Sequence, residues 1–305
     1  MNPTRRDVLK ASATLATGLA TGIGFSNTTM PQQTKFKLKY APHFGMFENH
    51  AGKDLFDQLK FCADQGFTAW EDNGMMGRDP QTQEKLGQTM RDLGIQMGVF
   101  VADAEWSKPV YALGGDENRA NLRKKAEAAV QVAKRVGVTW MTVVPGPYHL
   151  GLAWDYQTAN VIDCLKTMAE VFEPENLVMV LEPLNPRDHA GMFLTKIPQA
   201  FQICKAVDSP ACKILFDMYH QQITEGNIIP NIDAAWSQIA YFQQGDNPGR
   251  QEPLTGEMNY QNIFKHISRK SKDMIMGMEH GKSQGGKEGE IKLLNAYRWA
   301  DDFTI

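Results

Sequence analysis

The chain has 305 residues, of which 42% are hydrophobic and 22% charged, the composition of an ordinary globular protein. Its formal net charge is −3, and no block of Lys and Arg occurs beyond the first residues. A nucleic-acid or membrane-surface partner is therefore not indicated, because both usually need a concentrated basic footprint.

The first thirty residues differ in kind from the rest. Arg5 and Arg6 stand in a short charged segment, and an uncharged stretch of mainly Ala, Thr, Gly and Leu follows at residues 11–25. This order is typical of a secretory signal, and the stretch is too short to span a bilayer comfortably. The paired arginines resemble a twin-arginine signal, which implies export to the periplasm or cell envelope as a folded protein. We expect residues 1–34 to form this signal and a short linker.

From residue 36 onward, short apolar runs alternate eight times with longer amphipathic segments. The apolar runs are residues 36–44, 67–72, 95–103, 139–145, 177–184, 213–219, 239–245 and 274–279. The helical patterns are residues 53–65, 81–93, 117–136, 158–172, 198–207, 228–238, 260–268 and 290–301. Buried parallel strands have continuous apolar runs, and each needs a crossover to its neighbour. Eight such units predict a single-domain α/β protein, a (β/α)8 TIM barrel over residues 35–305. The alternative, a doubly wound open sheet, lacks the Gly-rich turn after the first strand.

Four successive late runs contain an oxygen-bearing side chain near their ends, namely Glu182, Asp217, Gln243 and Glu279. In a barrel these positions ring the C-terminal mouth, where active sites of this fold lie. Three carboxylates in one place repel one another unless a cation neutralises them. An all-oxygen set suits a divalent ion such as Mg²⁺ or Mn²⁺. The alternative is that these acids are unrelated helix caps and surface ion pairs.

Several segments around these residues carry a family resemblance. They are LEPLNPRD at 181–188, FDMYHQ at 216–221, QQGDNPGRQEP at 243–253, TGEMNY at 255–260 and GME at 277–279. Together they resemble the hydroxypyruvate isomerase family, which belongs to the wider xylose-isomerase-like barrels. The resemblance implies that Glu182 and Glu279 are both metal ligands and the acid–base pair, whereas Asp217 and Gln243 only ligate.

Four further residues are candidates for substrate binding. His220, three residues after Asp217, can hydrogen-bond a substrate oxygen that becomes anionic, or it can support the site from behind. Arg250 follows a Pro-Gly turn and can hold a carboxylate or hydroxyl bidentately. Glu71 and His43 end early strands and are placed to line the pocket, although a buried structural role is the alternative.

The resemblance implies a metal-dependent isomerase that moves a carbonyl in a small sugar or sugar acid through an enediolate, of the hydroxypyruvate to tartronate semialdehyde type. Because hydroxypyruvate metabolism is normally cytoplasmic, the export signal keeps other functions open. These are an exported sugar epimerase, a 3-keto-glycoside lyase or hydrolase with the same metal and glutamate pair, and a non-catalytic sugar-binding protein. We expect a small-molecule substrate, no nucleic acid and no membrane beyond the signal, and we leave a homo-oligomer open.

Overall fold

The computed structural model describes residues 34–305. The predicted signal therefore lies outside the described residues except for Thr34, and its assignment stays a prediction. Within the described part of the chain, no helix is both long enough and apolar enough to cross a membrane.

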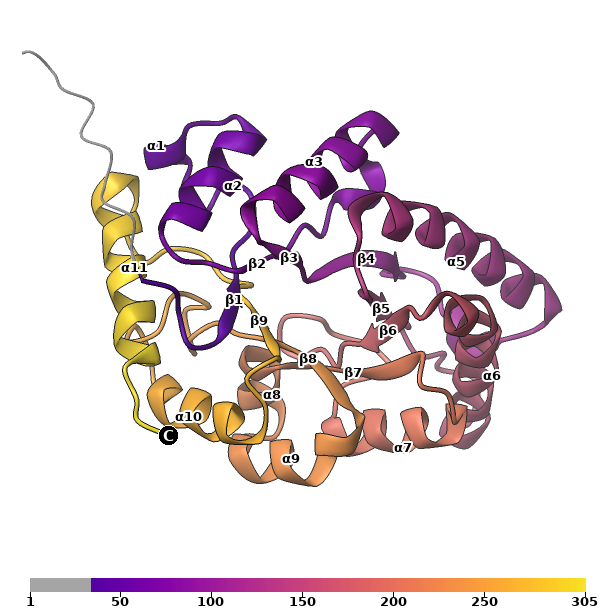
Figure 1. The fold of residues 1–305 in the computed structure, drawn as a ribbon. Helices are drawn as coiled ribbons and strands as arrows, with labels where there is room; N and C mark the ends of the chain where they lie inside the picture. The colour runs from indigo at the N-terminus through magenta and orange to yellow at the C-terminus, as the bar shows by residue number, and fades with distance from the viewer. Residues whose placement is uncertain (1–33) are drawn as a thin grey trace, which may run out of the picture. The chain divides into compact units, whose positions relative to one another are not determined.

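The described residues form parallel strands surrounded by helices (Figure 1). The strands are β1 (Lys39–Ala41), β2 (Ala69–Trp70), β3 (Gln96–Met97), β4 (Val99–Ala104), β5 (Trp140–Val144), β6 (Val178–Leu181), β7 (Cys212–Asp217), β8 (Ile239–Gln243) and β9 (Ile275–Gly277). Seven of them form one sheet in the order β1-β9-β8-β7-β6-β5-β4, and β2 pairs with β3. Each of the eight predicted apolar runs contributes a strand, and β3 and β4 share one run.

Two backbone hydrogen bonds join the small sheet to the large one. The Glu71 N–H donates to the Pro42 carbonyl at 2.9 Å, and the Asp72 N–H donates to the Val99 carbonyl at 3.2 Å. The chain after β2 thus lies between the end of β1 and the start of β4, and the ring of eight strand positions is complete. The prediction of a (β/α)8 TIM barrel is confirmed.

The helices follow the amphipathic segments. They are α1 (Glu48–Ala51), α2 (Leu55–Asp64), α3 (Pro80–Leu93), α4 (Val110–Leu113), α5 (Asp116–Val136), α6 (Trp154–Phe172), α7 (Ile197–Val207), α8 (Met218–Thr224), α9 (Ile228–Ala235), α10 (Tyr260–Lys270) and α11 (Gly286–Asp301). Local chemistry explains where several begin. Asp54 caps α2 by accepting from the Phe56 and Asp57 N–H groups, and Asp79 caps α3, whose first residue is Pro80.

Buried side chains from seven strands fill the barrel interior. They are Ala41, Ala69, Val99, Val180, Leu215, Tyr241 and Ile275. Two of these are alanines, and the large ring of Tyr241 is fully buried among the smaller side chains. This packing leaves no channel through the middle of such a barrel, and open space is confined to its ends.

Gly277, at the end of β9, is required by the side chains packed against it. A Cβ atom at this position would lie 1.8 Å from Glu71 Oε1 and 2.8 Å from Gln243 Cγ. We therefore predict that Gly277→Ala lowers the free energy of unfolding by about 1–3 kcal/mol, the usual result of overpacking a close-packed site. Urea unfolding followed by circular dichroism measures this difference. The control is Gly77→Ala, whose Cβ would meet nothing within 4 Å; equal losses in the two variants would contradict the steric argument.

Candidate active site

The four predicted ligand residues lie at the C-terminal ends of four neighbouring strands. Glu182 directly follows β6, Asp217 and Gln243 are the last residues of β7 and β8, and Glu279 comes two residues after β9. Asp217 is paired in register with Gln243, and Gln243 with Gly277. The parallel sheet thus presents these side chains at one edge because its strands end at the same level.

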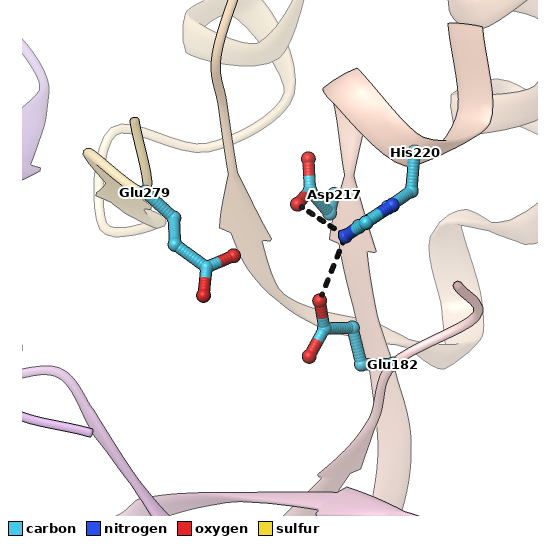
Figure 2. A group of neighbouring side chains, drawn as sticks. All are labelled: Glu182, Asp217, His220 and Glu279. Carbon is cyan, nitrogen blue, oxygen red and sulfur yellow. Dashed lines mark ion pairs between the residues drawn. The ribbon is translucent and has the colours of Figure 1, made fainter. Parts of the chain in front are cut away.

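The acidic side chains converge with one histidine. Glu182, Asp217, His220 and Glu279 each have a possible ligand atom within 4.8 Å of those of the other three, and Figure 2 shows Glu279 approaching from the side opposite His220. Asp217 and Glu182 are buried, whereas the Glu279 side chain is 27% exposed. An ion at the centre of such a cluster is within reach of several oxygens, and the three carboxylates therefore can bind a metal.

Gln243 provides an independent test of whether the site fits a metal. Its Oε1 atom is buried without a hydrogen-bond partner among the described residues. Its Nε2 atom lies 3.3 and 3.4 Å from the two carboxyl oxygens of Glu71, which hold the amide group with its oxygen on the other side. An unpaired buried carbonyl oxygen costs about 1–3 kcal/mol. A cation beside the neighbouring carboxylates would satisfy it, and the donor set fits a hard divalent ion.

His220 lies beside this set as a hydrogen-bond donor. Its Nδ1 atom is 3.3 Å from the backbone nitrogen of Asn185, which can only donate, and 2.7 Å from the Asn185 side-chain nitrogen. Nδ1 is therefore the unprotonated nitrogen. Burial lowers the pKa of His220 to about 4, so at neutral pH the ring is uncharged and Nε2 carries its one proton. Nε2 stands 3.5 Å from both Glu182 Oε1 and Asp217 Oδ2 and 3.3 Å from Arg250 Nη2, itself a donor. The shorter Asn185 contact at Nδ1 favours the tautomer with Nε2 protonated and directed at the carboxylates, so that Nε2 is not free to ligate a metal.

The place of His220 in the site is determined by where β7 ends. The predicted run at residues 213–219 is a strand only as far as Asp217, because Met218 and Tyr219 belong to α8. The Asp217 carboxylate caps this helix by accepting from the Tyr219 N–H at 2.7 Å. The first turn of α8 then brings His220 back beside Asp217. Asp217 thus both caps α8 and contributes to the cluster.

Arg250 is the basic side chain that contacts the cluster. Its Nη2 atom lies 2.8 Å from Glu279 Oε2 and 3.4 Å from Asp217 Oδ2, and its Nε donates to the Glu279 carbonyl at 3.2 Å. The guanidinium carbon also lies 4.8 Å from the centre of the Tyr219 ring, above its face. Its backbone has the unusual φ of 49°, consistent with a tight turn that directs the side chain inward. One guanidinium faces three carboxylates here, so negative charge is in excess.

Burial and the excess of negative charge raise the pKa values of both glutamates. Burial, followed by the repulsion of Glu279 and Asp217, raises the pKa of Glu182 well above its usual value. Burial also raises the pKa of Glu279 to about 7, with Asp217 adding to the rise and Arg250 opposing it. Without a counter-charge these acids resist full ionisation, whereas a nearby divalent cation would favour their ionised forms.

A cavity of about 220 Å³ opens over the cluster. One part of its lining is polar and consists of Asn73, Glu182, His189, His220, Gln243, Arg250 and Glu279. The remainder is mostly apolar and consists of Val101, Ala104, Trp106, Thr142, Val144 and Leu184, of which the Thr142 hydroxyl has no partner among the described residues. The space fits a small ligand with oxygens on one side and carbon atoms on the other.

The two early-strand candidates lie on the far side of Glu279. Glu71 is only 1% exposed, and burial raises its pKa well above the usual value, so its clearest role is to orient the amide of Gln243. His43 and Glu71 are joined by an isolated parallel bridge and line a second cavity of about 370 Å³. Asn73 and Glu279 line both cavities.

Sequence reasoning did not identify four residues that help to build the site. Asn73 donates to Glu279 Oε1 at 3.2 Å, and Asn185 fixes His220 as described. Asp188 accepts from Asn185 at 3.0 Å and from the Tyr219 hydroxyl at 2.8 Å, and the ring of His189 lies 5.3 Å from that of His220. A signal existed for Asn185 and Asp188, which lie in the segment 181–188.

Comparison with known proteins agrees with the barrel fold. The family model described as "Xylose isomerase-like TIM barrel" matches residues 59–299. Hydroxypyruvate isomerase of Escherichia coli is 30% identical over 58% of this chain and 68% of its own length. A 2-oxo-tetronate isomerase of Pectobacterium atrosepticum is 26% identical over 76% of this chain and 89% of its own length.

Among solved structures, a family 2 AP endonuclease from Brucella melitensis superposes with a TM-score of 0.73 at 20% sequence identity, over 83% of this chain and 96% of that one. At this identity the likeness concerns the fold alone. The sequence relatives are isomerases, and the family model covers most of the barrel. The chain therefore belongs to the xylose isomerase-like TIM barrel family and is an isomerase of the hydroxypyruvate isomerase type.

Proposed function

We propose that this protein is a divalent-metal-dependent isomerase that moves a carbonyl along a small sugar or sugar acid through an enediolate. The observation that carries the proposal is the cluster of Glu182, Asp217 and Glu279 beside the unpartnered oxygen of Gln243. The relatives named for hydroxypyruvate and 2-oxo-tetronate isomerisation support the same class of reaction.

The four oxygen-bearing residues would hold the ion, with Mg²⁺ or Mn²⁺ as the expected metals. When bound, the ion supplies a positive charge that orients the carbonyl and hydroxyl oxygens of the substrate and stabilises negative charge on them. Asp217 and Gln243 serve only to ligate, because Asp217 is fully buried under the helix it caps and Gln243 is neutral.

Glu182 and Glu279 are the acid–base pair. Isomerisation removes a proton from the carbon next to a carbonyl and returns one to the neighbouring carbon, and both carboxylates reach the same space from different strands. A carboxyl group whose pKa lies near 7, as that of Glu279 does, can both accept and donate a proton at neutral pH.

His220 and Arg250 assist the substrate oxygens. The Nε2–H group of His220 points toward the cluster, as its tautomer requires, and donates to an oxygen that becomes anionic. Arg250 offers a fixed cation at the rim, held by the Glu279 carbonyl and the Tyr219 ring. Both groups favour the charged transition state over the neutral substrate.

We predict that metal binding releases protons. Near pH 6.5 much of the Glu279 population is protonated, and its carboxyl must ionise before it ligates. Titration calorimetry with MnCl₂ in two buffers of different ionisation enthalpy measures the release. In Glu279→Gln the release should fall by the share of this carboxyl, and an unchanged release would exclude Glu279 as the source.

The same pKa predicts a pH dependence of stability. The folded pKa of Glu279 is raised from 4.5 to about 7, so its contribution is fully present below pH 4.5 and is lost as pH rises through 7. We expect the metal-free protein to lose at most about 3 kcal/mol from this group between these limits. Bound metal should remove the loss. Thermal unfolding at pH 5 and pH 8, with and without MnCl₂, is the measurement. Equal stability of the metal-free protein at the two pH values would contradict the prediction.

We predict that Glu182→Gln and Glu279→Gln each lower turnover by about 10²–10⁴-fold, the usual contribution of a positioned acid or base. Incubation of the metal-loaded protein with hydroxypyruvate in deuterated water, followed by NMR, should show deuterium entering the substrate in the wild type and not in either variant. The same incubation with a ketose, which unlike hydroxypyruvate has stereocentres, followed by product analysis, distinguishes isomerisation from epimerisation.

The matched control is Glu175→Gln, on a surface carboxylate paired with Lys134 and remote from the two cavities. This variant should keep the full rate of exchange. Exchange that survives in Glu279→Gln would refute the assigned acid–base pair, and absence of exchange with every sugar tested would favour a binding protein.

We also propose export by the twin-arginine route, on the strength of Arg5, Arg6 and the uncharged stretch that follows them. Replacing both arginines by lysine keeps the charge but removes the paired-arginine feature. We expect the full chain, expressed in a bacterium that has this route, to move from the periplasmic to the cytoplasmic fraction. Equal fractionation of both forms would contradict this route.

A further inference from the structure

The second cavity extends the candidate active site toward the N-terminal strands. It has a volume of about 370 Å³ and is lined by residues that follow β1 and β2, together with Glu279. Because Asn73 and Glu279 line both cavities, the two spaces adjoin at this hydrogen-bonded pair, and a ligand whose reacting end lies at Glu279 borders the second cavity. At ~30 Å³ per water molecule, the space matches about a dozen waters, far more than a three-carbon acid at the cluster would need.

Arg78 lines this cavity as a prepositioned donor. Its Nε donates to Asp72 Oδ2 at 2.5 Å, and its guanidinium carbon lies 4.8 Å above the ring centre of Phe44. Asp72 is itself held, because its Oδ1 accepts from the Gly74 N–H at 3.2 Å. Neither terminal nitrogen of Arg78 has a partner among residues 34–305, and the side chain is 25% exposed. A planar donor pair is thus fixed in position with hydrogen-bonding capacity to spare.

Other lining groups supply acceptors. Asn73 donates through Nδ2 to Glu279, and its Oδ1 has no partner in the described part of the chain. His43 Nδ1 lies 2.9 Å from the Phe44 carbonyl, an acceptor, so Nδ1 bears a proton. The other nitrogen, Nε2, has only a 3.5 Å contact, with the His280 carbonyl. In this tautomer Nε2 is an acceptor, and a ligand hydroxyl can donate to it.

The charges of the cavity select the kind of ligand. The guanidinium of Arg78 is already paired with Asp72, and the carboxyl groups of Glu71 and Glu279 line the same space. A ligand carboxylate would meet little uncompensated positive charge here. Hydroxyl groups match better, because each can accept from Arg78 and donate to Asn73 or His43.

From this geometry we propose that the second cavity binds the neutral, hydroxylated tail of a substrate longer than four carbons, with Arg78, Asn73 and His43 as its polar contacts. The substrate class is then a five- or six-carbon sugar rather than a three-carbon acid. This deepens the isomerase function proposed above and rests on it for the position of the reacting end.

The experiment measures binding without turnover. Calorimetry on metal-loaded protein compares glycerol, erythritol, xylitol and D-glucitol, which increase from three to six hydroxylated carbons. We expect the affinity to rise by about tenfold or more between erythritol and D-glucitol, as one well-placed hydrogen bond to a charged group would produce. Arg78→Met, which keeps the stem over Phe44, should abolish most of this rise.

Two further variants keep the test decisive. His43→Phe removes an acceptor of the cavity and should reduce the increase in affinity from erythritol to D-glucitol. The control is Arg123→Met, because Arg123 pairs with Glu170 outside both cavities. This variant should keep the full increase in affinity. Thermal unfolding confirms that each variant is folded. Equal affinities for glycerol and D-glucitol, or a rise that survives in both cavity variants, would overturn the proposal.

Charge selectivity is tested with D-gluconate, which has the length of D-glucitol and one carboxylate. An Arg78-dependent preference for D-gluconate would overturn the neutral tail in favour of an acidic one. Failure of the isomerase function has a different signature, namely no deuterium exchange into any sugar while the Arg78-dependent rise among polyols remains. Exchange into hydroxypyruvate without any such rise would leave the isomerase intact and remove the second cavity from substrate binding.

Discussion

The constraint on which the rest of the site depends is charge balance at the barrel mouth. Three carboxylates, from Glu182, Asp217 and Glu279, share a space in which Arg250 is the one guanidinium in contact and His220 is neutral. Together with the guanidinium, a divalent ion would bring this set to neutrality. The raised pKa values of both glutamates have the same origin, because burial and mutual repulsion disfavour their ionised forms. The groups proposed to transfer protons near neutral pH are thus the same groups that would attract a metal ion.

The barrel positions these charges through a less visible layer of contacts. Glu71 stands where a side chain on residue 277 would be, and it turns the amide of Gln243 so that the oxygen faces the cluster. Asn185 fixes the tautomer of His220 in a comparable way. In both cases the hydrogen bonds of a buried polar side chain fix the orientation of its neighbour, Gln243 or His220. The geometry of the site is therefore set by the fold before any ligand arrives, which is the arrangement that electrostatic catalysis needs.

The sequence predicted the barrel well because its signal is repetitive: eight apolar runs alternate with eight amphipathic segments, and each produced its element. It also indicated that oxygen-bearing side chains lie at the ends of neighbouring late strands, since a polar residue that ends a buried run is conspicuous at Asp217 or Gln243. Their role as metal ligands stays a prediction. The short helix α8 was missed, because the run at 213–219 is apolar as far as Tyr219 and only the capping bond of Asp217 shows where the strand stops. Asn73 and Arg78 were missed for another reason. They lie on the loop after β2, where no periodicity constrains the chain, and their importance appears only when Glu279 is brought beside them from 206 residues away.

Removal of a proton from the substrate carbon next to a carbonyl gives an enolate. Isomerisation, epimerisation and elimination can all proceed from this intermediate. The cluster alone does not distinguish them, because Glu182 and Glu279 reach the same space in each case. What distinguishes them is how the rest of the substrate is held. The wall of Val101, Val144 and Leu184 that faces the cluster is apolar apart from the Thr142 hydroxyl, whereas the loop after β2 offers several donors and acceptors in the direction of Arg78. In the proposed mode of binding, a long substrate passes Glu279 rather than Glu182. The side on which its tail lies would then decide which proton is removed, and specificity would reside in the loops after the N-terminal strands rather than in the strands that carry the three carboxylates.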